Sequence, residues 1–375
     1  MIALPSAVWW GNDTPTPVPT PDIGGEAGDF VEYIMENTDL KAWDVWFFGN
    51  SDSFGGTWGV KPSDLLPQLM GGQGSSNDAV SLVWGLITGM LSGVVGVFLM
   101  YIGLAVIKSL INGMRPKGTL PQTASSVIRV FAGLTALAAV WGAVTSCKEC
   151  LLGLGKLSGV LALVLLGLLT LFGMGSSAIA QQAAMTLYGS TVIGCLSKLV
   201  LPLAAAGGIM GALGAFGKEL HTDGFGKLCH KACKWIIALI SAAYFIMTAV
   251  RGISGGAADS VLLRTTKLAA GGLPFAGGLV SDSLETAFAC MRLVKNAVGS
   301  VAVLLALGYV AKPVILLLLH GLALRMAAAL SVPLGAGGLS PVFVQIADML
   351  SVILSILVAA AVLLCVCVAG TALLL

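Results

Sequence analysis

The sequence predicts an all-α protein: a polytopic transmembrane helical bundle with broken or re-entrant helices and a short extracytoplasmic N-terminal region. The first observation behind this is composition. Of the 375 residues, 57% are apolar and only 10% are charged, and the mean hydropathy is +0.95. A soluble domain normally has about a quarter of its residues charged, so that class is excluded. The second is that long apolar runs alternate with Gly, Pro and short charged loops, as expected where helices must satisfy every backbone polar group.

Residues 1–79 form the first predicted unit, an acidic extracytoplasmic region with a Pro-rich linker. It holds eleven acidic residues against Lys41 and Lys61, whereas the rest of the chain holds eighteen basic and seven acidic residues. Because cytoplasmic loops of membrane proteins hold the Lys and Arg excess, this acidic part is expected outside. Residues 14–21 contain four prolines, which exclude helix and sheet ladders and predict an extended linker.

Aromatic residues cluster near the end of this first unit. Helical spacing over residues 30–35 is followed by Trp43, Trp46 and Phe48. Aromatic side chains just before a membrane span commonly lie at the headgroup level. Two interpretations stay open, an interfacial anchor and a small extracytoplasmic docking element.

Residues 80–375 form the second predicted unit, a multi-span membrane domain of about nine helices. The polar segment 177–196 carries Gln181 and Gln182, and its glutamines must face other helices or water. Counting it as a span places the basic loops around Lys117 and Lys227 on one side, inside, with the N-terminus outside. The predicted spans are 80–107, 127–146, 157–174, 177–196, 199–216, 235–250, 288–311, 313–330 and 344–372.

Small residues mark two helix faces for close packing. Gly85, Gly89 and Gly93 lie at i, i+4 and i+8 of the first span, a spacing that lets helix backbones approach closely. The same argument applies to the glycines at 207, 211 and 214. The partner helix lies in the same chain or in another subunit.

Three segments share an apolar-Pro-apolar step followed by Gly-Gly. They are residues 201–208, residues 273–278 and residues 332–338. Proline removes a backbone donor and glycine frees the chain, so each segment predicts a place where a helix breaks and restarts. Paired broken helices are typical of secondary transporters. The hinge residues are Pro274, Gly277, Gly278 and Pro333.

No motif for catalysis is present: the sequence has no phosphate-binding loop, zinc-protease helix or nucleophile elbow. The Cys147/Cys150 and Cys229/Cys233 pairs suggest a metal or redox site, but a structural metal site needs four converging ligands. We therefore expect buried, inert thiols, no metal, no cofactor and no enzymatic activity.

Polar residues beside the spans are the candidates for function. Asp282, Glu285, Arg292, Lys295 and Asn296 are predicted to follow one helical face into an apolar segment. This face is either an amphipathic surface helix, or the wall of a conduit or a subunit contact. Three further candidates precede it, and one isolated carboxylate follows near the start of the last span. These four are Asp259, Arg264, Lys267 and Asp348.

The charged segment 259–278, together with residues 295–299 (Lys-Asn-Ala-Val-Gly) and 332–338 (Val-Pro-Leu-Gly-Ala-Gly-Gly), resembles the stage III sporulation protein AE family of endospore-forming bacteria. The resemblance is collinear over roughly residues 75–375. It implies a multi-pass protein of the mother-cell membrane around the forespore. Its implied role is the membrane-embedded component of the channel, or feeding-tube, complex that joins the two cells.

The resemblance also implies partners. These are the other stage III sporulation proteins, a cytoplasmic secretion-type ATPase and ring-forming subunits. Membrane lipid and further copies of the chain are expected as well, and nucleic acid is not. A stand-alone secondary transporter or permease is one alternative function, and a structural scaffold of the complex is another. A transporter needs a compact substrate site within one chain, whereas a channel subunit has polar faces that neighbouring chains complete.

Overall fold

The computed structural model of the chain is helical in the regions that it describes, with no strand among them. This confirms the all-α prediction. Side chains at 120–126, 213–216 and 251–293, and at a few single positions, lie outside the description. The described residues are 41–49, 94–110, 120–171, 173–216, 223–271 and 277–372.

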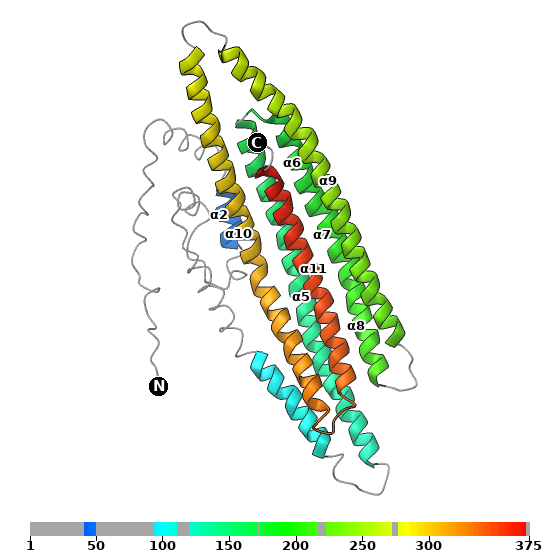
Figure 1. Cartoon of the computed structure of the whole chain (residues 1–375). Helices are drawn as coiled ribbons and strands as arrows, with labels where there is room; N and C mark the ends of the chain where they lie inside the picture. The colour runs from blue at the N-terminus through cyan, green and yellow to red at the C-terminus, as the bar shows by residue number, and fades with distance from the viewer. Residues whose placement is uncertain are drawn as a thin grey trace, which may run out of the picture.

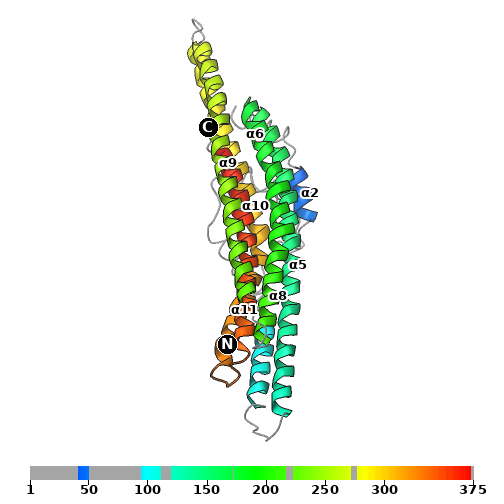
Figure 2. The ribbon, with the colours of Figure 1, turned by 90° about the vertical axis from the view of Figure 1, so that its right-hand side faces the viewer.

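Five long helical rods run up and down beside one another (Figure 1). Seen from the side, α9, α10 and α11 form one layer, and α5 with the rod from α6 to α8 forms the other (Figure 2). A separate helix, Val94–Leu110, precedes α5. The elements are α2 (Lys41–Gly49), α5 (Leu120–Leu171), α6 (Gly175–Leu187), η2 (Tyr188–Val192), α7 (Ile193–Cys195), η3 (Leu196–Val200), α8 (Leu201–Phe216), α9 (Asp223–Gly271), α10 (Gly277–Ser331) and α11 (Ser340–Ala372).

Helix α11 is the centre of the bundle. It packs against α5, α8, α9 and α10, and it has the highest hydropathy of the long helices. Phe343, Ile346, Ile353 and Leu357 are fully buried along it. A helix that is apolar on most of its circumference is expected in the interior of a bundle.

Helix α5 joins two of the predicted spans, 127–146 and 157–174, into one rod. The charged residues Lys148, Glu149 and Lys156 lie between these two predicted spans. All three are exposed, while Cys147 and Leu151 are buried. The 3.6-residue period therefore continues through the charged stretch, and the predicted interruption is wrong.

Two more pairs of predicted spans also merge. Spans 177–196 and 199–216 form one continuous rod from α6 to α8 that contains the π-helical turns η2 and η3. Spans 288–311 and 313–330 both lie in α10, which passes through Pro313 without ending. The predicted span 80–107 lies partly outside the described residues.

The helices are longer than a bilayer requires. Five of them, within the described residues, are long and apolar enough to cross a membrane. The 52 residues of α5 span roughly 78 Å at 1.5 Å per residue, against a hydrocarbon core of about 30 Å. The chain is thus a polytopic helical membrane protein whose rods extend beyond the hydrocarbon region.

Glycines end two of the rods. Gly173 and Gly335 have φ of 71° and 74°, a left-handed conformation that glycine adopts without a Cβ clash. After α5, the N–H of Met174 donates to the carbonyl of Leu169; after α10, the N–H of Ala336 donates to that of Ser331, each at 2.9 Å. These are Schellman caps, and the second confirms the break predicted within 332–338.

The other two helix breaks were predicted within residues 201–208 and 273–278. Residues 201–208 are continuously helical in α8, so that prediction is wrong; the π turn η3 immediately precedes Pro202, and the glycines serve packing instead. In the charged segment 259–278, α9 continues as a helix to Gly271. Helix α10 restarts at Gly277, while Pro274 lies outside the described residues.

Helix α2 docks its aromatic face on the bundle. Trp43, Trp46 and Phe47 are buried, and the Trp46 and Tyr309 ring centroids lie 5.2 Å apart. Val45 and Phe48 stay exposed. The aromatic cluster therefore contacts protein on one side and leaves two apolar side chains outward.

Candidate functional site

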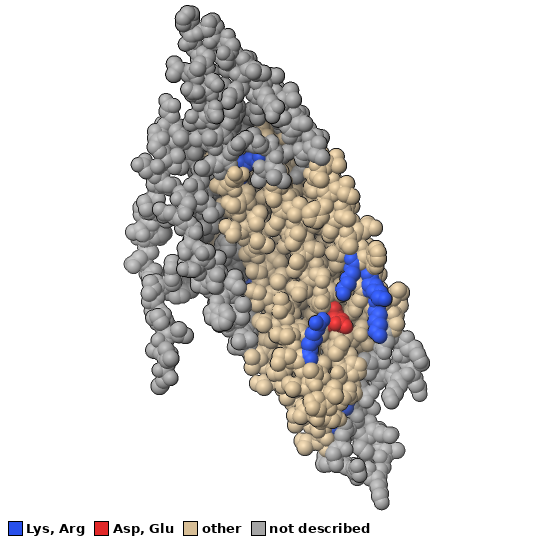
Figure 3. Space-filling model, viewed as in Figure 1, with Lys and Arg blue, Asp and Glu red and all other residues tan. Residues whose placement is uncertain are grey.

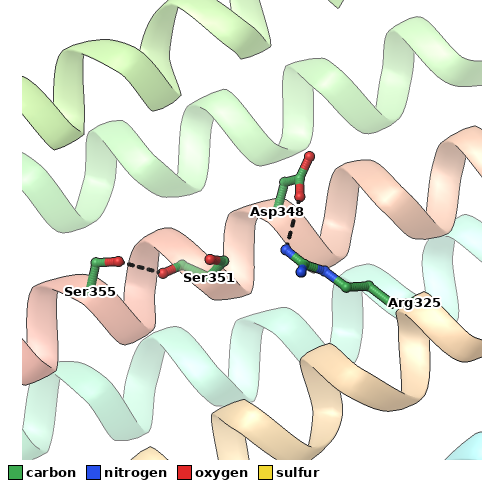
Figure 4. A network of polar contacts seen from close by, with 4 residues as sticks. All are labelled: Arg325, Asp348, Ser351 and Ser355. Carbon is green, nitrogen blue, oxygen red and sulfur yellow. Dashed lines mark hydrogen bonds and ion pairs between the residues drawn. The ribbon is translucent and has the colours of Figure 1, made fainter.

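An ion pair between α10 and α11 is the centre of the candidate site. The guanidinium of Arg325 donates to the carboxylate of Asp348 at 3.3 Å (Figure 4). The side chains are 57% and 47% exposed, respectively. Asp348 was predicted from its position near the start of the last span. Its partner, Arg325, was not.

Two hydroxyls continue the polar line along α11. Ser351 and Ser355 follow Asp348 at i+3 and i+7, so the three residues share one face of the helix (Figure 4). The hydroxyl of Ser355 donates to the carbonyl of Ser351 at 2.8 Å. Both serines are half-buried, so this polar face stays open to a neighbour.

Helix α9 brings further polar groups to Asp348. The charges of Asp348 and Lys234 both act on His230, which places the three residues in one electrostatic neighbourhood. The Nε2 of His230 is buried and has no hydrogen-bond partner among the described residues. The same holds for the amide nitrogen of Gln345, one turn before Asp348. Together, Arg325, Asp348, His230, Lys234 and Gln345 form what we call the lower polar cluster.

Close glycine packing holds the helices of this cluster together. A Cβ on Gly207 of α8 would stand 2.6 Å from the Cβ of Cys229 on α9. A Cβ on Gly211 would collide with the side chain of Gln345, and one on Gly208 with Met349. The predicted packing role of the glycines at 207 and 211 is therefore confirmed, with both partner helices in the same chain.

Charged side chains gather on one face of the bundle. Figure 3 shows an acidic group flanked by basic groups on a surface with few other charges. Lys227, Lys231 and Lys234 are exposed on α9, and Arg325 is exposed on α10. The charge on this face is thus mainly positive.

A cavity of about 250 Å³ lies elsewhere, between helix Val94–Leu110, α5, α10 and α11. Its polar lining is Tyr101, Ser146 and His320, and the remainder is mostly apolar. The Nδ1 of His320 lies 2.9 Å from the carbonyl of Leu316, which only accepts, so Nδ1 carries the proton in this geometry. The Tyr101 hydroxyl is buried without a hydrogen-bond partner among the described residues.

The other predicted residues are dispersed. Lys295 is buried at 1% exposure, whereas Asn296 is exposed. The prediction that these two neighbours lie on one helical face is therefore wrong. Pro333 lies exposed in the turn before α11, and Gly277 and Gly278 begin α10. Asp259, Arg264, Lys267, Asp282, Glu285 and Arg292 have helical backbone, but their side chains lie outside the described residues, as do Gly85, Gly89 and Gly93 altogether.

The described cysteines are mostly buried in the bundle. Cys147, Cys150, Cys229, Cys233 and Cys367 are buried. Within the part of the chain that the structure describes, no group of three or more His, Cys, Asp or Glu side chains is placed to hold an ion. The thiol of Cys233 instead faces the carbonyl of Val200 at 3.8 Å.

The sequence matches the model of one protein family. The model for stage III sporulation protein AE matches residues 75–373, which is most of the chain. The chain belongs to the stage III sporulation protein AE family. The family places it among sporulation components, and its apolar helices make it a multi-pass membrane member.

One curated relative in the family is stage III sporulation protein AE of Bacillus subtilis (strain 168). It is 24% identical over 233 residues, which is 62% of this chain and 58% of that protein. No solved structure matches the chain.

Proposed function

We propose that this chain is the membrane-embedded component of the channel complex that joins mother cell and forespore during endospore formation. Family membership supports a sporulation role. The single observation that carries the finer role is the half-exposed polar line of Arg325, Asp348, Ser351 and Ser355 on α10 and α11. A half-exposed polar line on two otherwise apolar helices offers ionic and hydrogen-bonding groups that a neighbouring chain can pair with.

The proposed location is the mother-cell membrane around the forespore, with the N-terminal region outside the cytoplasm. The proposed partners are the stage III ATPase and the ring-forming subunits. In this arrangement the chain has no catalytic residue of its own, and the ATPase supplies the energy. The polar line is the surface at which another subunit docks.

Isolation of the tagged chain from sporulating cells tests this assignment. Cross-linking before extraction should recover the ATPase and the ring-forming proteins with the wild-type chain. Asp348→Lys should lose them, because it places two positive charges together, while the exposed control Lys156→Glu should keep them. Recovery of the same partners by Asp348→Lys would contradict docking at the polar line.

A stand-alone transporter is the second candidate function, and the cavity favours it. Its lining of Tyr101, Ser146 and His320 lies within one chain, as a transporter site requires. Sporulation that depends on Tyr101 and His320 but is unaffected by Asp348→Lys would favour the transporter.

A further inference from the structure

Three lysines form an exposed row on α9. Lys227, Lys231 and Lys234 are four and three residues apart, so they lie along one side of the helix. The face that packs against α8 is different and contains the buried residues Cys229 and Cys233. None of the three lysines forms an ion pair with a described carboxylate. Asp348, the nearest acidic group, is engaged by Arg325.

The row stands at a boundary in the charge pattern. Residues 235–250 of α9 contain no Asp, Glu, Lys or Arg, and neither do residues 296–311 of the antiparallel α10. Each stretch is roughly 24 Å long at 1.5 Å per residue, close to the thickness of a hydrocarbon core. Trp235, 77% exposed, follows the last lysine directly. Trp is enriched at the headgroup level, so the row lies where headgroups begin.

An apolar strip lies beside the row on α9 and runs toward the hydrocarbon. Trp235, Leu239 and Ile246 are spaced by four and seven residues and are all strongly exposed. Leu228, two turns before Trp235, belongs to the same strip. The surface therefore pairs positive charge with exposed apolar side chains, in the order in which a phospholipid presents its phosphate and its acyl chains.

We propose that the row of Lys227, Lys231 and Lys234 binds the phosphate of an anionic phospholipid headgroup, with an acyl chain lying along Trp235, Leu239 and Ile246. Lysine ammonium groups attract anionic lipid at a membrane surface. The strip favours a lipid over a free phosphate, because a free phosphate leaves the apolar side chains uncovered. This inference does not depend on the channel assignment.

Native mass spectrometry of the full chain in detergent measures this binding. The probes are phosphatidylglycerol, phosphatidylcholine and soluble glycerol 3-phosphate. We expect phosphatidylglycerol to bind about tenfold more tightly than phosphatidylcholine. The triple change Lys227→Gln, Lys231→Gln and Lys234→Gln should abolish that preference, and the same positions changed to Arg should keep it. Glycerol 3-phosphate should not compete.

The matched control removes three other exposed lysines. Lys148→Gln, Lys156→Gln and Lys198→Gln change the net charge equally but lie on α5 and η3, and this control should keep the preference. For the wild-type chain, salt should weaken phosphatidylglycerol binding and spare phosphatidylcholine, a test that needs no variant. Equal binding of the two lipids, an equal loss in the control, or full competition by glycerol 3-phosphate would overturn the proposal.

Discussion

Gly207 of α8 faces Cys229 of α9 so closely that a Cβ on the glycine would lie 2.6 Å from the cysteine Cβ. A Cβ atom is fixed to its backbone and cannot rotate away. The contact therefore sets how near α8 and α9 approach, and the lower polar cluster depends on this approach because His230 and Lys234 follow Cys229 on α9.

Gly207→Ala should separate these two helices. Overpacking of this kind costs about 1–3 kcal/mol, and we expect a lower thermal midpoint for the purified chain. Gly194→Ala is the control, because nothing lies within 4 Å of its Cβ position and alanine favours a helix. Equal midpoints for the two variants would show that α8 and α9 do not pack through Gly207.

Gln181 on α6 lies beside Cys367 on α11, and a cross-link can test this contact. Its amide nitrogen is 3.4 Å from the Cys367 carbonyl and 4.0 Å from its sulfur. Gln181→Cys should therefore cross-link to Cys367 when the remaining cysteines are replaced, as read by mass spectrometry of the joined peptides. Gln182→Cys points to another side of the helix and should not. The reverse pattern would mean that the register of α6 against α11 is different.

Tyr188→Phe should cost about 1 kcal/mol in stability. The buried Tyr188 hydroxyl donates to the carbonyl of Ala360 at 2.8 Å, and this bond ties η2 to α11. Thr186→Ala loses only a local bond to Gln182 on the exposed side and should change stability by less than about 0.5 kcal/mol. Thermal unfolding in one detergent compares them, and a Tyr188→Phe chain as stable as wild type would contradict the bond.

The ion pair between Arg325 and Asp348 should contribute little to stability. Both side chains are about half exposed, and such pairs are typically worth less than about 1 kcal/mol. A double-mutant cycle of Arg325→Gln and Asp348→Asn should give a coupling in that range. A coupling of several kcal/mol would instead assign the pair a structural role.

The helical class could be predicted from sequence, but the helix ends could not. Long apolar runs predict helices wherever they occur. The predicted spans 127–146 and 157–174 leave out Lys148, Glu149 and Lys156, because hydropathy counts charges without regard to the face on which they lie. Their exposure on a continuous α5 shows that three charges on one outer face leave the buried face intact.

The candidate site was predictable only in part. Asp348 is conspicuous as a lone carboxylate near a span, whereas Arg325 lies 23 residues earlier and meets it only through the register between α10 and α11. That register depends on the turn between the two helices, which Gly335 closes in a left-handed conformation. The sequence does not specify this φ angle. The sequence shows only that the span before Asp348 carries a basic residue, Arg325. It does not show that the two side chains meet.

The proposal that the polar line serves the channel complex is tested most directly by Arg325→Glu. Sporulation efficiency is scored beside the amount of protein in the membrane, in an endospore-forming host that carries this chain in place of its own copy. The reversal places two carboxylates together at the proposed docking surface, and the ion pair that it removes contributes little to stability. We therefore predict a severe loss of spores at a normal membrane level. Lys198→Glu, an exposed reversal on η3, should sporulate normally. Normal sporulation of Arg325→Glu at a normal membrane level would contradict the account.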